Sequence, residues 1–228
     1  MGTSVLIVDD HHIFREGLRS LLERQPDIEV LEEASDGRAA TAQARRLQPD
    51  IVLMDISMPG LNGVEATRQI LIENPRTKVL ALSMHADGRF VTSMLRAGAS
   101  GYLLKDCAFE ELALAIETLM REKVYISPEV AGVIVDAAVR QEPSRVGDPL
   151  RPPLTCRAAT APPLSSRERE VLQLLAEGHS TREIAGLLHL AIKTIESHRK
   201  QIKDKLRLRS VAALTKYAIR EGLTSLDD

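Results

Sequence analysis

The stretch VLIVDD, residues 5–10, joins an unbroken apolar run to two adjacent carboxylates. A run that is apolar at every position, and not only at alternate ones, is typical of a strand buried on both faces of a parallel sheet. A second run of this kind, IVLMD at residues 51–55, ends in a further carboxylate. These two stretches predict an α/β sheet that carries acidic groups at the carboxyl ends of its strands.

Outward from these stretches, short aliphatic runs alternate with longer amphipathic segments from Ser4 to about Glu122, as in a parallel sheet covered by helices. Five strands are predicted at Val5–Val8, Ile28–Ala34, Ile51–Met54, Val79–Leu82 and Gly101–Leu104. Helices are predicted at His12–Arg24, Gly37–Leu47, Gly63–Glu73, Gly88–Ala97 and Ala108–Lys123. The pattern predicts a doubly wound α/β domain with five parallel strands.

The composition changes between Gln141 and Pro163, where six of the chain's 11 prolines lie. So many prolines exclude a helix or a central strand and favour a semi-rigid linker. Ahead of the linker, Pro128–Arg140 is predicted to be helical, with proline at its start. We therefore divide the chain into a first domain at residues 1–124, a helix and linker at 125–162, and a second domain at 163–228.

The second domain shows helical patterns throughout. Ser165 and Glu168 have the spacing of a capping box, as do Ser180 and Glu183. The first predicted helix ends before Gly178, and the others are Thr181–Leu188, Lys193–Leu206 and about Ser210–Glu221. Four short helices without strands predict a small all-α domain.

Charge is divided unevenly along the chain. Residues 1–125 carry 14 Lys and Arg against 19 Asp and Glu, whereas residues 192–209 carry seven against two. A basic stripe in the second domain alone indicates a polyanionic partner for that domain. Cys107 and Cys156 lie in different segments and form neither a disulfide framework nor a zinc site. With no leader pattern and no apolar run of about 20 residues, we expect a cytoplasmic protein without a membrane partner.

Polar side chains follow several of the predicted strands. Asp9 and Asp10 follow the first strand and Asp55 the third, and a strand order of 2-1-3-4-5 makes these strands neighbours. Three converging carboxylates repel one another unless a cation is present, and their oxygens suit Mg²⁺. Ser83 and Lys105, at the ends of the fourth and fifth strands, place a hydroxyl and an ammonium near Asp55. A polar residue at one strand end is usually only solvated, but five at matching ends indicate a phosphoryl acceptor site with Asp55 as nucleophile.

Two other kinds of site are disfavoured at this edge of the sheet. No glycine-rich turn follows the first strand, which argues against a dinucleotide or P-loop site. His11 and His12 begin a helix without an evident third ligand, so they are not assigned to a transition metal.

The third helical run of the second domain, Lys193–Leu206, has two distinct faces. Ile195, Ile202 and Leu206 recur at helical spacing and are expected to face the core. The remaining positions are mostly polar or basic. A helix-turn-helix places such a second helix in the major groove of DNA, so we expect Thr181–Leu188 to be the scaffold helix and Lys193–Leu206 the recognition helix.

The first domain resembles the receiver domains of two-component response regulators over about residues 1–122. The resemblance is carried by Val8-Asp9-Asp10, by LMDISMPG at residues 53–60, by Ser83 and by GYLLK at residues 101–105. It implies a flavodoxin-like fold in which Asp55 accepts phosphate from a histidine kinase. It also implies that Mg²⁺ is held by Asp9, Asp10, Asp55 and the Ser57 carbonyl. The same resemblance implies that Ser83 and Lys105 bind the phosphoryl oxygens, and that Tyr102 has a switching role coupled to Ser83.

The second domain resembles the LuxR-type helix-turn-helix of the NarL/FixJ response regulators over about residues 163–225. The matching segments are LSSREREVL at residues 164–172, Ile184-Ala185 and KTIESH at residues 193–198, whereas the apolar turn at residues 187–191 departs from the family's polar turn. The resemblance implies DNA phosphate contacts from Lys193, Thr194 and Arg199 and base contacts around Glu196, Ser197 and Lys200, with Lys203 in the same DNA-binding set. It also implies that Val211–Leu223 pairs two such domains.

Together these features predict a response regulator that is phosphorylated on Asp55, forms a homodimer on activation, and binds half-sites in double-stranded promoter DNA. Phosphorylation is expected to free the recognition helix, and RNA polymerase is a further expected partner. The only catalysis expected is that of its own phosphotransfer and dephosphorylation. One alternative is a Mg²⁺-dependent aspartyl phosphohydrolase, but such an enzyme usually has a second acid where this chain has Ser57. The other is a constitutive DNA-binding protein with a silent receiver.

Overall fold

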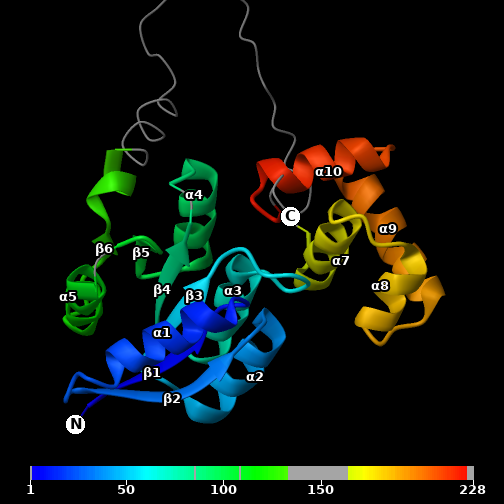
Figure 1. The fold of residues 1–228 in the computed structure, drawn as a ribbon. Helices are drawn as coiled ribbons and strands as arrows, with labels where there is room; N and C mark the ends of the chain where they lie inside the picture. The colour runs from blue at the N-terminus through cyan, green and yellow to red at the C-terminus, as the bar shows by residue number, and fades with distance from the viewer. Residues whose placement is uncertain (1, 85, 108, 133–163, 225–228) are drawn as a thin grey trace, which may run out of the picture.

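The computed structural model describes residues 2–84, 86–107, 109–132 and 164–224. An α/β domain and a helical domain lie beside each other (Figure 1). The parallel strands are β1 (Thr3–Val8), β2 (Ile28–Ala34), β3 (Ile51–Asp55), β4 (Lys78–Ser83), β5 (Gly101–Leu104) and β6 (Tyr125–Ile126). The helices of this domain are α1 (His12–Leu22), α2 (Gly37–Leu47), α3 (Gly63–Glu73), α4 (Gly88–Ala97) and α5 (Phe109–Met120).

The strand order is β2-β1-β3-β4-β5-β6, so the predicted doubly wound sheet is confirmed, but its predicted number of strands is wrong by one. Tyr125 pairs with Gly101 and Ile126 with Tyr102, which adds β6 beside β5. A strand of two residues is too short to show a periodicity of its own. Residues 128–132 are helical, whereas the rest of the predicted helix Pro128–Arg140 and the linker up to Pro163 lie outside the described residues.

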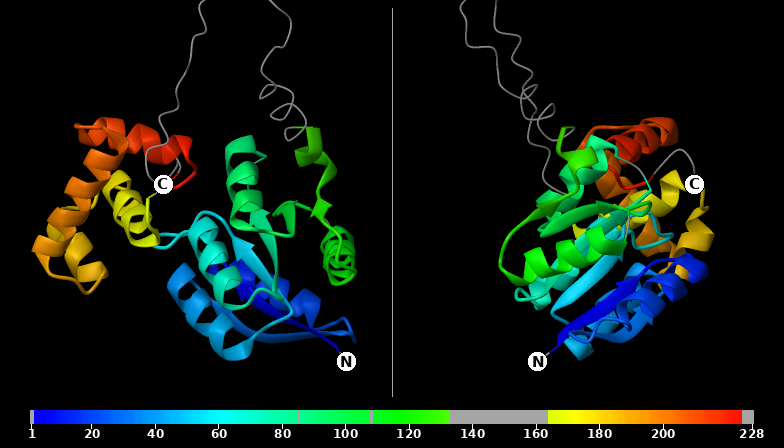
Figure 2. Two further views of the ribbon diagram at one scale, coloured as in Figure 1. Left: turned by 180° about the vertical axis from the view of Figure 1, so that it is seen from behind. Right: turned by 60° about the vertical axis from the view of Figure 1, so that its left-hand side comes forward.

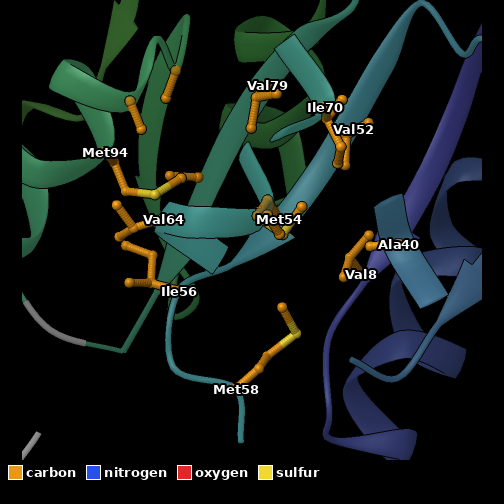
Figure 3. Close-up of a cluster of buried hydrophobic side chains, with 14 of the residues drawn as sticks. Val8, Ala40, Val52, Met54, Ile56, Met58, Val64, Ile70, Val79 and Met94 are labelled. Carbon is orange, nitrogen blue, oxygen red and sulfur yellow. The ribbon is translucent and has the colours of Figure 1, made fainter. Parts of the chain in front are cut away.

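Helices cover both faces of the sheet, as two views of the ribbon show (Figure 2). Along β1, Val5 and Ile7 pack with residues of α1 and α5, whereas Leu6 and Val8 pack with residues of α2, α3 and α4. Successive side chains of a strand point to opposite faces, so an unbroken apolar run supplies both cores. Figure 3 shows part of the core that includes Val8.

Helix α3 starts very close to the end of β3. A Cβ atom on Gly63 would lie 1.9 Å from the carbonyl oxygen of Asp55, so only glycine fits at this position. The Gly63 amide donates to the Ile56 carbonyl at 3.0 Å, and the Asn62 side chain caps α3 by accepting from the Glu65 amide at 2.9 Å. The loop that follows Asp55 is therefore held tightly against the sheet.

The second domain consists of α7 (Ser166–Ala176), α8 (Thr181–Leu187), α9 (Ile192–Leu206) and α10 (Val211–Arg220). Both predicted capping boxes are confirmed, at Ser165 with Glu168 and at Ser180 with Glu183. Ile195 and Ile202 are buried in the core of this domain, and Leu206 packs against it, as the helical spacing predicted. In the described part of the chain, no helix is both long enough and apolar enough to cross a membrane.

Candidate functional site

The acidic residues predicted from the sequence meet at the carboxyl edge of the sheet. Asp9 follows β1 and Asp55 ends β3, two strands that are paired with each other. Asp9 is 0% exposed and Asp55 is 2% exposed. The Lys105 ammonium lies 2.7 Å from Asp9 Oδ2 and 2.8 Å from Asp55 Oδ2, so one buried cation bridges two buried carboxylates.

The residues of this pocket fit a hard divalent cation. Asp9 Oδ2 and Asp55 Oδ2 are buried, and among the described residues they share the single Lys105 ammonium. Ligand atoms of Asp9, Asp10, His11 and Asp55 all lie within 4.8 Å of one another. Buried carboxylates that share one ammonium keep an excess of negative charge, and their oxygens suit Mg²⁺.

The structure also places the two histidines that follow Asp10. His11 Nδ1 lies 2.9 Å from Asp10 Oδ1, and the His11 amide donates to Asp9 Oδ1 at 2.9 Å. His12 lies apart from the cluster and faces Glu16 on its own helix at 3.6 Å. Imidazole nitrogen suits transition metals better than Mg²⁺. We therefore assign His11 to the rim of the pocket, where it orients Asp9 and Asp10.

Burial controls the ionisation of Asp55. Loss of water around its carboxyl group raises the pKa of Asp55 to about 6, and the negative charge of Asp9 acts in the same direction. The Lys105 ammonium partly offsets this rise. The carboxyl group of Asp55 is thus mostly ionised at neutral pH. Because Lys105 offsets only part of the negative charge in the pocket, the binding of a cation is favoured.

Ser83 and Tyr102 lie next to this pocket, at the end of β4 and on β5. Both are buried, and Tyr102 is fully buried. A hydrogen bond joins the two side chains, while burial raises the pKa of Tyr102 to about 12. The structure thus brings Tyr102 and Ser83 together, as the sequence analysis expected.

Two residues of α1 support the pocket and were missed by the sequence analysis. The Phe14 ring lies under the Lys105 ammonium, with 5.0 Å from Nζ to the ring centroid. The Arg15 guanidinium donates to the Asp9 carbonyl at 2.6 Å. Both follow the paired aspartates within one or two turns of helix, and that proximity is the signal that could have pointed to them.

Helix α9 presents a polar stripe to solvent. Lys193, Glu196, Ser197 and Lys200 are exposed, whereas Thr194, Arg199 and Lys203 are partly buried. The Arg199 guanidinium hydrogen-bonds the Thr181 hydroxyl and so ties α9 to α8. Ala191 at the N-cap provides no side-chain cap. The residues predicted to contact DNA therefore lie along one helix, most of them on its open face.

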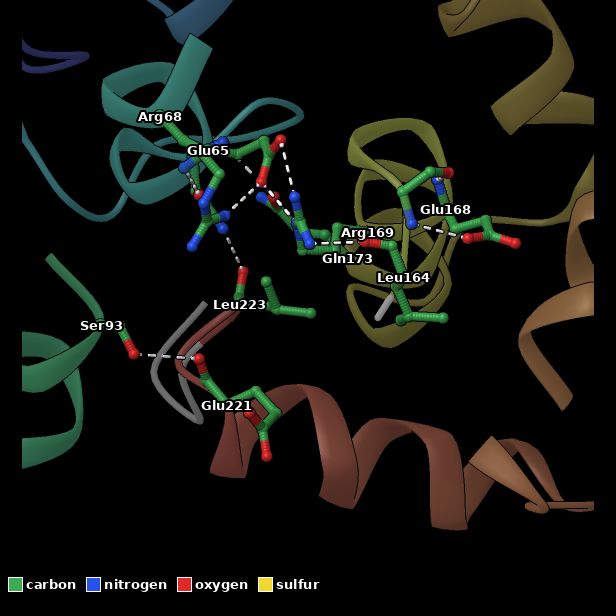
Figure 4. A network of polar contacts seen from close by, with 11 residues as sticks. Glu65, Arg68, Ser93, Leu164, Glu168, Arg169, Gln173, Glu221 and Leu223 are labelled. Atoms are coloured by element: carbon green, nitrogen blue, oxygen red, sulfur yellow. Dashed lines mark hydrogen bonds and ion pairs between the residues drawn. The ribbon is translucent and has the colours of Figure 1, made fainter. Parts of the chain in front are cut away.

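The two domains are joined by a polar contact that the sequence analysis did not predict (Figure 4). Arg169 Nε on α7 lies 2.6 Å from Glu65 Oε2 on α3. Glu65 is 2% exposed, and although burial alone would raise its pKa, the hydrogen bonds from Arg169 and Ser166 hold the pKa of Glu65 below its usual value. Arg38 of α2 pairs with Glu170 of α7 in the same interface.

Further contacts of this interface reach the loop after Asp55 and helix α4. Gln173 Nε2 donates to the Met58 carbonyl, and the Asn62 amide donates to Gln173 Oε1, both at 3.3 Å. Asn62 Nδ2 also donates to the Leu223 carbonyl at 2.9 Å, and Ser93 Oγ of α4 donates to the Glu221 carbonyl at 3.2 Å. The segment after α10 is thereby attached to two elements of the first domain.

These interdomain contacts leave the recognition helix open. Among the described residues, the hydrogen bonds and ion pairs between the domains come from α7 and from the segment after α10, and none comes from α9. In Figure 1, α7 lies between the first domain and helices α8 and α9. The sequence left open whether the first domain covers the recognition helix, and in this arrangement the polar contacts between the domains do not involve α9.

The fold and its two sites define a class of protein, in which an α/β domain with an acidic pocket is joined to a helix-turn-helix domain. Residues 5–117 match the response regulator receiver domain, and residues 162–218 match the luxR family of bacterial regulatory proteins. The oxygen regulatory protein NreC of Staphylococcus carnosus is 37% identical over 96% of this chain and 98% of its own length. The transcriptional regulatory protein DegU of Brevibacillus brevis is 37% identical over 96% of this chain and 93% of its own length.

Solved structures agree with these relatives. A LuxR-family response regulator from Aurantimonas sp. is 39% identical, with a TM-score of 0.58 over 61% of this chain and 99% of that one. RcsB from Salmonella enterica serovar Typhimurium, bound to promoter P1flhDC in the presence of the phosphomimetic BeF3⁻, is 27% identical, with a TM-score of 0.58 over 96% of this chain and 99% of that one. The chain belongs to the NarL/FixJ family of two-component response regulators, which combine a receiver domain with a LuxR-type DNA-binding domain. It is a transcription-regulating protein and not the phosphohydrolase considered above.

Proposed function

We propose that a histidine kinase phosphorylates this response regulator on Asp55, and that the phosphorylated protein dimerises and binds paired half-sites in promoter DNA. The observation that carries the proposal is the bridge from Lys105 to Asp9 and Asp55, because it joins a buried nucleophile to a cation at the edge of the sheet. RNA polymerase is the further partner through which bound protein changes transcription.

The chemistry at Asp55 follows from the groups around it. A carboxylate oxygen of Asp55 forms a bond to phosphorus as the bond from phosphorus to the kinase histidine nitrogen breaks. The Lys105 ammonium and the Ser83 hydroxyl hold the phosphoryl oxygens. Asp9, Asp10, Asp55 and the Ser57 carbonyl hold Mg²⁺, which when bound neutralises the added negative charge. Water attack on the same acyl phosphate in this pocket reverses the signal.

The interdomain contacts provide a route from Asp55 to the second domain. Met58, whose carbonyl accepts from Gln173, lies in the loop that follows Asp55, and the β4–α4 segment links Ser83 to Ser93. When Ser83 and Lys105 draw toward the phosphoryl group, α4 and this loop shift and the contacts with α7 and the end of α10 weaken. Weaker contacts release Val211–Leu223 to pair with a second copy.

The second domain supplies the DNA contacts. Lys193, Thr194, Arg199 and Lys203 bind phosphates, and residues around Glu196, Ser197 and Lys200 face base edges. The first-turn amides of α9, which lack a side-chain cap at Ala191, are further donors to phosphate. The RcsB structure with promoter DNA and BeF3⁻ supports this assignment through the similarity of the two chains.

One observation favours a second candidate, a regulator that binds DNA whether or not it is phosphorylated. The outer face of α9 is exposed in the arrangement with closed domains, so single half-sites are accessible without any change of conformation. In this alternative the receiver pocket adjusts only the pairing of two copies.

Phosphorylation of the isolated protein tests the proposed acceptor. Wild-type protein and Asp55→Asn are treated with acetyl phosphate, with and without Mg²⁺, and analysed by intact mass and by borohydride trapping of the acyl phosphate. We expect one Mg²⁺-dependent adduct on Asp55 and none in the variant. An adduct at another residue, or equal labelling of the two proteins, contradicts the assignment of Asp55.

A further inference from the structure

Glu196 is an acidic residue on a surface that otherwise suits DNA. Lys193, Glu196, Ser197, Lys200 and Gln201 are exposed and recur at helical spacing, so they form one stripe along α9. Glu196 lies in the N-terminal half of this helix, where helix-turn-helix proteins contact base edges. A carboxylate here faces the negative potential of the duplex and requires a compensating partner.

That partner is not supplied by the protein. Within the described residues, the Glu196 side chain takes part in no hydrogen bond or ion pair, although Lys200 stands in the position that favours a pair with it. Three other carboxylates of this domain are engaged: Glu168 lies 2.6 Å from Lys205, Glu170 pairs with two arginines, and Glu183 closes a capping box. Asp204 is as open as Glu196 but lies about two turns further along α9, outside the N-terminal half of the helix. Glu196 is therefore an open acceptor on the exposed stripe.

The chemistry of the major groove limits what can satisfy it. A carboxylate only accepts hydrogen bonds, and the donors on base edges are the N4 amino group of cytosine and the N6 amino group of adenine. Adenine also presents N7, an acceptor that repels the second carboxylate oxygen, whereas cytosine presents no acceptor beside its amino group.

Resting on the DNA-binding function proposed above, we propose that Glu196 determines sequence specificity by accepting a hydrogen bond from cytosine in each half-site. Lys200 follows one turn later, about 6 Å along the helix axis, and carries the donors that suit guanine. The pair of residues therefore reads a cytosine with a neighbouring or paired guanine.

A different role for Glu196 is to orient Lys200 through an ion pair formed on DNA. The two roles differ in how they respond to glutamine. Glutamine at position 196 can donate and accept toward N6 and N7 of adenine, so a base-reading position changes its preference from cytosine to adenine. A position that only orients a lysine loses the same function with glutamine as with alanine.

The test uses the full-length protein treated with acetyl phosphate and Mg²⁺, and a duplex DNA library randomised across two half-sites. Bound DNA is sequenced for wild type, Glu196→Gln, Glu196→Ala and the control Asp204→Asn. Asp204 is an exposed carboxylate of α9 about two turns further on, beyond the part of the helix that contacts bases. Circular dichroism and the salt dependence of binding confirm that each variant keeps its fold and its phosphate contacts.

Wild type and Asp204→Asn are expected to enrich cytosine at one position of each half-site, by roughly tenfold or more over the other bases. Glu196→Ala should lose the preference at that position alone, and Glu196→Gln should change it to adenine. An identical motif in all four proteins, or glutamine behaving as alanine does, overturns the role of Glu196 and leaves the DNA-binding function intact. If wild type enriches no sequence at all, the proposed function itself is contradicted.

Discussion

At the scale of single residues, the account depends on the buried carboxylates and their shared ammonium. Asp9, Asp55 and Lys105 come from three strands, and their convergence was predictable because the carboxyl ends of parallel strands meet at one edge. Their burial and the position of Phe14 were not predictable, because spacing along a sequence does not reveal how closely a helix covers a strand end.

Replacement of Asp55 by asparagine should stabilise the metal-free protein at neutral pH. Burial and Asp9 raise the pKa of Asp55 to about 6, so the folded state binds this proton more tightly than the unfolded state does. By linkage, the stability that protonation of Asp55 contributes to the wild-type fold is fully present below about pH 4. It is lost as the pH rises through about 6. We expect Asp55→Asn to be more stable at pH 7 by on the order of 1–3 kcal/mol, and to lack this fall.

Urea denaturation of both proteins at several pH values, without divalent metal, measures the difference. Addition of Mg²⁺ should reduce the difference in stability between the two proteins. Mg²⁺ binding stabilises the folded wild type more, because the variant offers the cation one carboxylate fewer. Equal stability of the two proteins at pH 7 would show that the surroundings of Asp55 do not raise its pKa in the folded protein.

At the scale of secondary-structure elements, most of the fold could be predicted from the sequence. The bounds of α2, α3 and α4 coincide with the predicted helices, because capping residues and glycines mark their ends. The missed strand β6 forms through its pairing with β5, which local sequence does not show. Gln173 lies within the apolar run VLQLL and could have pointed to the contact between the domains. A polar side chain in a buried run needs hydrogen-bond partners, and those of Gln173 lie in the first domain.

Gly63→Ala tests the close approach of α3 to β3. A Cβ atom at this position would lie 1.9 Å from the Asp55 carbonyl, so the helix must move away from the strand that carries the proposed phosphoacceptor. We expect a loss of stability of more than about 2 kcal/mol and weaker phosphorylation by acetyl phosphate. Thermal and urea unfolding measure the loss of stability, and intact mass measures the extent of phosphorylation.

Gly17→Ala in α1 is the matched control, because a Cβ atom there meets no other atom within 4 Å. Alanine in a helix should stabilise the protein by about 0.5–1 kcal/mol at this site. If both substitutions have the same small effect, the tight packing at Gly63 is not a feature of the protein in solution.

At the scale of the whole molecule, the contact between the domains joins the loop after Asp55 and helix α3 to the DNA-binding domain. Its residues lie more than 100 positions apart, as in the pair of Glu65 with Arg169, so no local pattern could have revealed it. Because the outer face of α9 is open, the proposed function assigns this contact a role in restraining the pairing of DNA-binding domains and not in masking α9.

Glu65→Gln should loosen this contact, because it removes the buried carboxylate that Arg169 binds and leaves a partly buried guanidinium without its counterion. We expect a larger radius of gyration in small-angle scattering and tighter binding of paired half-sites by the unphosphorylated protein, by several-fold. Glu73→Gln is the control, since Glu73 pairs with Arg45 inside the receiver domain. An unchanged radius of gyration in Glu65→Gln would mean that the Glu65–Arg169 pair does not hold the domains together.

The central claim is that the state of Asp55 controls DNA binding, and the affinity of the full-length protein for a duplex with two half-sites tests it most directly. Fluorescence anisotropy is measured with and without acetyl phosphate and Mg²⁺, for wild type and for Asp55→Asn, on duplexes with one or two half-sites. We predict that phosphorylation strengthens wild-type binding to the two-site duplex at least tenfold, changes binding to the one-site duplex little, and has no effect on Asp55→Asn. Equal affinity of phosphorylated and unphosphorylated wild type for the two-site duplex would contradict the account.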